Sequence, residues 1–146
     1  MTFASLLETL SERLGTPLED AGGASALEID GTTVVLQDAG DLLLLRAEIG
    51  DLPDEGREAL LTTVLEANHL YAGTGGGTLA LAPGAPRLVL QKYTWFDRLD
   101  PDAVPDLIAR FAATADSWRR LLADYSPASS ASPDSPPPPS TDILPV

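Results

Sequence analysis

The sequence contains no cysteine and only one histidine, His69. The absence of cysteine excludes disulfides, thiolate metal sites and a cysteine nucleophile, and a single histidine excludes a metal site built from several. No serine or aspartate is identifiable as a catalytic partner for His69, so a structural or solvent-exposed role is favoured. We therefore expect a binding protein that is not an enzyme and needs no metal or cofactor.

Basic residues are also scarce, with nine lysines and arginines against 22 acidic residues and a formal net charge of −13. The nine bases are scattered along the chain, so a nucleic-acid backbone would be repelled and no nucleic acid is expected as a partner. The acidity has two interpretations that both remain open: a well-solvated surface that resists aggregation, or a docking surface for basic segments of a partner.

Long apolar runs and a basic N-terminal region are absent too. The chain begins Met1-Thr2-Phe3 and shows neither the pattern of a signal peptide nor a run long enough to span a membrane. Together with the lack of cysteine, this predicts a cytoplasmic protein without membrane insertion.

A change in composition divides the chain after Tyr125. Residues 1–125 have the composition of one ordered domain, whereas residues 126–146 are dominated by proline, serine and alanine and are predicted to be disordered. The apolar end of this tail, residues 143–146, is either a short recognition motif or an extension without function.

The first half of the domain reads as one helix followed by an antiparallel meander. Apolar residues recur at helical spacing from Phe3 to Leu14, and Gly15 provides the stop. Turns are expected at Asp30-Gly31 and at residues 38–41. Three strands are predicted: Ala26 to Asp30, Thr32 to Gln37 and Leu42 to Ile49.

The second half adds a helix, a hairpin and a final helix. Asp51 is expected to cap a helix from Pro53 to about Leu70, and Asp102 to cap the last helix, which ends near Tyr125. Between them two strands are predicted: Thr78 to Ala82 and Arg87 to Thr94. The order α-β-β-β-α-β-β-α predicts an α+β sandwich with helices packed on an antiparallel sheet.

The glycine-rich run from Gly73 to Thr78 resembles a phosphate-binding loop only superficially. A Walker loop needs Gly-Lys-Ser/Thr leading into a helix, and a dinucleotide fingerprint needs a strand before it and a helix after it. Here a helix precedes the glycines and a strand follows them. The run is therefore interpreted as a helix end and a turn.

Two segments carry more apolar residues than one small core requires. The middle helix has one stripe of Leu60, Val64, Ala67 and Tyr71 and a second stripe of Leu61, Leu65 and Asn68. A helix that is apolar on two sides is generally buried on two sides, which suggests a second copy of the chain as partner. In the third strand, alternation places Leu42 and Leu44 away from the core and open to a binding partner.

Several residue strings resemble the Tir chaperone (CesT) family of bacterial type III secretion chaperones. The strings run in the family's order and together cover about residues 2–125: Leu14-Gly15, Leu65-Glu66-Ala67-Asn68, Gly73 to Leu81, Leu88-Val89-Leu90, Leu99-Asp100, Phe111, Ala115, Trp118-Arg119 and Leu122. The resemblance implies a homodimer that binds the N-terminal region of a secreted effector and keeps it ready for export without ATP.

The resemblance also assigns residues to two contacts. The dimer contact of the family, through the middle helix and the neighbouring strand, corresponds here to Leu61, Leu65, Asn68, Leu79 and Leu81. The contact with the effector, along the first helix and the N-terminal strands, corresponds to Leu6, Leu10, Val35, Leu42 and Leu44. A regulatory or structural dimer of the same fold without a secreted client remains the alternative, and a small-molecule enzyme is disfavoured because no site is assembled.

Overall fold

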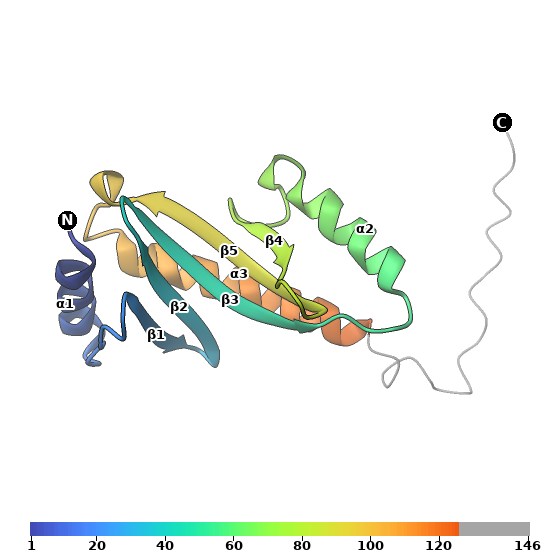
Figure 1. Ribbon diagram of the computed structural model, residues 1–146, viewed down its shortest axis with the longest axis horizontal. Coiled ribbons are helices and arrows are strands. Elements are labelled where there is room, and N and C mark those ends of the chain that lie inside the picture. Colours follow the sequence, from blue (N-terminus) through green and yellow to red (C-terminus); the bar gives the residue numbers. More distant parts are fainter. Residues whose placement is uncertain (126–146) are drawn as a thin grey trace, which may run out of the picture.

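The structure is a computed structural model that describes residues 1–125, and the predicted tail of residues 126–146 lies outside the described part. The predicted α+β fold with helices on an antiparallel sheet is confirmed, with two short 3₁₀ turns added (Figure 1). The elements are α1 (Phe3–Leu14), β1 (Ala24–Ile29), β2 (Thr32–Ala39), β3 (Leu42–Asp51), α2 (Arg57–Asn68), η1 (His69–Tyr71), β4 (Thr78–Leu81), β5 (Arg87–Trp95), η2 (Phe96–Arg98) and α3 (Val104–Asp124).

The five strands form one antiparallel sheet in the order β1-β2-β3-β5-β4. The predicted hairpin turn at Asp30-Gly31 is present, with positive φ angles of 48° and 81° that match the twist of the flanking strands. The second turn is tighter than predicted, because Asp38 pairs within the sheet and its carboxylate accepts the Gly40 N–H at 3.0 Å. A two-residue connection thus joins β2 to β3.

One face of the sheet is covered by α3, which runs beneath β2 and β3, and by α1 at the N-terminal end of α3 (Figure 1). The two helices, this face and the buried Leu60 and Val64 of α2 (Arg57–Asn68) form a single apolar core with β3 at its centre. Close approach is possible at Gly50, where a Cβ atom would lie 2.8 Å from Leu122 Cδ2, so a glycine is needed where β3 crosses the end of α3.

The middle helix is shorter than predicted at both ends. It begins at Arg57 after Gly56, which has a φ of 73° and cannot continue a helix toward Pro53. The predicted cap Asp51 instead belongs to β3. The helix ends at Asn68, so Tyr71 does not continue the stripe of buried side chains that Leu60 and Val64 begin.

The last helix begins after Ala103, and Asp102 is not its cap. Asp102 forms an ion pair with Arg13 and so connects the end of α1 to the start of α3. Pro105 occupies the second helical position, where its missing N–H has no intrahelical partner to lose. Within residues 1–125, no helix combines the length and apolar character needed to cross a membrane.

Candidate protein-binding surfaces

The face of the sheet that points away from α1 and α3 carries a group of apolar side chains. In the register of β3 with β5, Leu42 lies opposite Trp95 and Leu44 lies opposite Tyr93. Tyr93 is 64% exposed and Trp95 is 44% exposed, while the two leucines are half-buried. With the half-buried Val35 of β2 on the same face, these residues form what we call the open-face patch.

The alternation predicted for the third strand is present in the structure. Leu43 and Leu45 are completely buried against the helices, whereas Leu42 and Leu44 retain exposed surface on the other face. Because side chains of a strand alternate between its faces, one strand contributes to both the core and the open-face patch.

The other two residues that the resemblance assigned to effector contact lie elsewhere. Leu6 and Leu10 belong to the buried stripe of α1 and have no exposed surface. The structure therefore brings Val35, Leu42 and Leu44 together on one face and places Leu6 and Leu10 in the core on the opposite side. In this conformation their side chains are not accessible to a partner.

Sequence analysis did not find the two aromatic members of the patch. Tyr93 and Trp95 alternate with Lys92 and Thr94 along β5, which is a signal for one face of a strand. That signal does not say which residues lie opposite. The pairing of β5 with β3 spans the whole of α2 and β4, and only this pairing joins the aromatic rings to the leucines.

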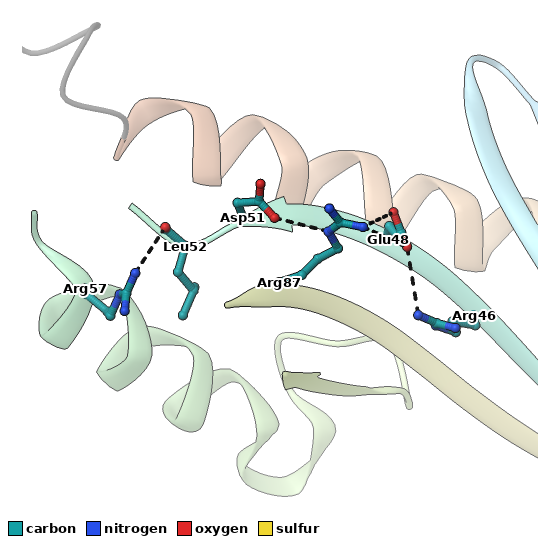
Figure 2. A network of polar contacts seen from close by, with 6 residues as sticks. All are labelled: Arg46, Glu48, Asp51, Leu52, Arg57 and Arg87. Atoms are coloured by element: carbon teal, nitrogen blue, oxygen red, sulfur yellow. Dashed lines mark hydrogen bonds and ion pairs between the residues drawn. The ribbon is translucent and has the colours of Figure 1, made fainter. Parts of the chain in front are cut away.

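Charged residues follow along β3 as it approaches its end (Figure 2). The Arg87 guanidinium donates to Asp51 Oδ1 at 3.1 Å and lies 3.4 Å from Glu48 Oε2, and Arg46 lies 3.9 Å from Glu48 Oε1. The hydrogen bond to Asp51, with the negative charges of Glu48 and Asp51, raises the pKa of Arg87 above its ordinary value. Because these side chains are solvent-exposed, the network contributes little to stability.

A hollow of about 600 Å³ lies beside this network. It opens where β2 and β3 diverge, because their pairing stops at Val35 opposite Arg46. Arg119 of α3 also lines the hollow and donates a hydrogen bond to the Thr32 hydroxyl. The open face is thus apolar toward the β2–β3 turn and charged toward the end of β3.

Further exposed apolar side chains lie on α2, η1 and β4. Four large apolar side chains are exposed there: Leu65 by 70%, Leu70 by 83%, Tyr71 by 58% and Leu81 by 46%. We call these four residues the α2–β4 patch. Leu65 and Leu81 were predicted at a dimer contact, and the structure leaves both accessible.

The other three predicted dimer residues are more enclosed. Leu61 is half-buried and packs against the core, and Leu79 is only 4% exposed. The Asn68 amide is held within its own subunit, since Nδ2 donates to the Leu79 carbonyl at 3.0 Å and Oδ1 accepts the Leu79 N–H at 2.9 Å. This clamp occupies backbone groups on the outer edge of β4, which a partner strand would otherwise use.

The glycine-rich run connects η1 to β4, so it does not lead into a helix and lacks the geometry of a nucleotide-binding loop. Its backbone is fixed by the Trp118 indole N–H, which donates to the Gly73 carbonyl at 2.9 Å. His69 begins η1 at the end of α2. In the described part of the chain, no three histidine, aspartate or glutamate side chains gather in a way that would hold a metal ion.

Comparison with known families decides between the interpretations of this fold. A model described as the Tir chaperone protein (CesT) family matches residues 5–119, which is more than half of the chain. The chain belongs to the Tir chaperone (CesT) family. The resemblance seen in the sequence is thereby confirmed, and membership of a chaperone family agrees with a binding protein and not with an enzyme.

Solved structures share the fold at low sequence identity. A chain of the ExsC–ExsE complex has 22% identity and a TM-score of 0.65, with coverage of 84% of this chain and 97% of that one. A chain of the Pseudomonas aeruginosa type III secretion complex ExoU–SpcU has 20% identity and a TM-score of 0.66, with coverage of 83% of this chain and 98% of that one. YbjN from E. coli, described as a putative transcription regulator, has 15% identity and a TM-score of 0.61, with coverage of 85% of this chain and 91% of that one. No curated protein sequence matches the chain.

Proposed function

We propose that this protein is a type III secretion chaperone that binds the N-terminal region of a secreted effector and keeps that region export-competent without ATP. The observation that carries the proposal is the open-face patch in a chain of the Tir chaperone family. A contiguous group of exposed aliphatic and aromatic side chains on a soluble domain is typical of a surface that binds another protein.

The geometry favours an effector segment in extended conformation. Of the two outer strands, β4 has its edge clamped by Asn68, whereas β1 has no strand on its outer side among the described residues. Starting from the two-residue hairpin at Asp30-Gly31, alternation directs the backbone groups of Ala26 and Glu28 toward this free edge. A segment paired there would use backbone hydrogen bonds, and its continuation over Leu42 and Leu44 would add apolar contacts.

The protein is further proposed to act as a homodimer through the α2–β4 patch. Leu65 and Leu81 supply the exposed apolar surface, and Leu61, Asn68 and Leu79 support it from within each subunit. Because Asn68 occupies the backbone of Leu79, the two copies would meet by side-chain packing and not by joining their sheets at this residue. Effector and second copy would then occupy separate surfaces.

The direct test is affinity purification of the tagged chain from its native host, followed by identification of bound polypeptides and of the segment that proteolysis leaves protected. The proposal expects the N-terminal segment of a larger protein, bound equally well with and without ATP. Recovery of only the chain's own dimers would contradict it. That result would favour the second candidate, a regulatory or structural dimer without a secreted client, since the same fold also occurs in YbjN.

A further inference from the structure

On the helix-covered side of the sheet, a hollow of about 490 Å³ lies between the glycine-rich loop and α3. Its floor is apolar and includes Leu107 and the almost fully buried Phe111. Lys92 of β5 and Arg110 of α3 place two cationic groups at the same hollow. It therefore combines positive charge with an adjacent apolar surface.

The two cationic groups at this hollow form no ion pair with acidic side chains of the described domain. Six basic side chains form ion pairs elsewhere in the described domain: Arg13, Arg46, Arg57, Arg87, Arg119 and Arg120. Lys92, Arg98 and Arg110 do not, and two of these three line the hollow. Within residues 1–125, Lys92 Nζ donates only to the Gly75 carbonyl, at 3.2 Å. In a chain with a net charge of −13, this concentration of unpaired positive charge favours an acidic ligand.

The wall of the hollow is held in place before any ligand binds. Gly75 and Gly76 have φ angles of 59° and 86°, and a Cβ atom on Gly76 would lie 3.2 Å from Lys92 Nζ. The buried Thr74 hydroxyl donates to the Gly77 carbonyl at 2.6 Å and closes the loop. A fixed wall lowers the ordering cost of binding.

An open strand edge adjoins the hollow. Strand β4 starts opposite Gln91, so β5 has no strand on its outer side from Lys92 to Trp95 within the described residues. The Asn68 clamp shows that Leu79 faces away from β5, and alternation from that position directs the backbone groups of Tyr93 toward the open edge. An extended segment paired with Tyr93 would direct alternate side chains to the side of the sheet where the hollow lies.

We propose that residues 142–145 of this chain, Asp-Ile-Leu-Pro, bind in this hollow and along the open edge of β5. These residues lie outside the described part. The negative charge of the Asp142 carboxylate complements the positive charges of Lys92 and Arg110. One of the two aliphatic side chains that follow would pack on the apolar floor of Leu107 and Phe111. The contact covers a strand edge that would otherwise be open to other chains.

The connecting chain is long enough for this contact within one molecule. Along α3, Phe111 lies about 20 Å from Asp124 at the helical rise per residue. The residues between Tyr125 and Asp142 span up to about 50 Å when extended. A tether of this length gives an effective concentration in the millimolar range, so that weak individual contacts suffice.

The test measures backbone order parameters of Ile143 and Leu144 by ¹⁵N relaxation in the full chain. The proposal expects values near about 0.8 in the wild type and below about 0.6 in the double variant Lys92→Gln with Arg110→Gln. The matched control is Arg98→Gln, which removes the third unpaired cation without touching the hollow and should leave both order parameters as in the wild type.

The signal of the Trp118 indole N–H reports in the same spectra whether the glycine-rich loop keeps its place in each variant. If the double variant disturbs the loop, Asp142→Asn tests the same contact from the tail and should also lower both order parameters. Flexible values in the wild type, or rigid values that survive the loss of Lys92 and Arg110, would overturn the proposal. Rigidity that disappears on dilution would also overturn it, because the tail would then bind a second copy.

Discussion

The face of the sheet covered by α1 and α3 and the face left open are built from the same strands but differ in exposure. On the covered face, Leu43 and Leu45 have no accessible surface, and they pack with the helices into one core. On the open face, Leu44 is half-buried and its cross-strand partner Tyr93 is 64% exposed. Neighbouring positions along one strand thus alternate between side chains that stabilise the fold and side chains that are available for binding.

The largest effect on stability is expected from a pair of matched truncations in β3. Leu45→Ala removes a completely buried side chain and should lower the free energy of unfolding by about 2–5 kcal/mol. Leu44→Ala removes the same atoms from the open face and should cost less than about 1 kcal/mol. Denaturant unfolding of both variants measures the difference. Equal losses would show that side chains on the two faces contribute equally to the free energy of unfolding.

A charge placed on the α2–β4 patch should change association more than folding. Leu65 is 70% exposed, so Leu65→Asp should leave the free energy of unfolding of a subunit within about 0.5 kcal/mol. In a dimer the carboxylate would be buried without a partner, and light scattering should report the mass of a monomer. Leu14→Asp, on the exposed end of α1, is the control that should remain dimeric. A wild type that is already monomeric at micromolar concentration would contradict the proposed dimer.

The smallest effect is expected from the ion network at the charged end of the open face. Arg87→Gln should leave the free energy of unfolding close to that of the wild type, because the network is solvent-exposed. Because the pKa of Arg87 is raised in the folded state, any stabilisation from its charge is fully present below the pKa of the unfolded chain. It is lost only as the pH rises through the folded-state pKa, in strong alkali. The difference from the wild type should shrink at 1 M salt. A loss as large as that of Leu45→Ala would show that the network supports the fold directly.

The parts of the fold that depend on local patterns could be predicted from the sequence. Alternation along β3 identifies Leu42 and Leu44 as the residues off the core, and Asp30-Gly31 fixes the first hairpin turn. Both features are encoded within a few neighbouring residues. The residue strings that identify the family are likewise read directly from the chain.

The parts that depend on contacts between distant segments could not be predicted in this way. The Asn68 clamp on Leu79 was hidden because an asparagine on a helical stripe does not reveal which backbone groups it meets. The position of Trp95 opposite Leu42 requires the order of strands in the sheet. Leu6 and Leu10 were assigned to an effector contact by resemblance, and only the packing of α1 shows that both are buried.

The central claim is that the open-face patch binds the effector, and one paired measurement on Leu42→Asp with Leu44→Asp tests it directly. The effector peptide is the N-terminal segment identified by purification from the native host. Calorimetric titration should show affinity reduced at least a hundredfold, because two carboxylates would be desolvated without partners in the complex. Thermal unfolding of the same variant should stay close to the wild type. Unchanged affinity in a folded variant would contradict the claim.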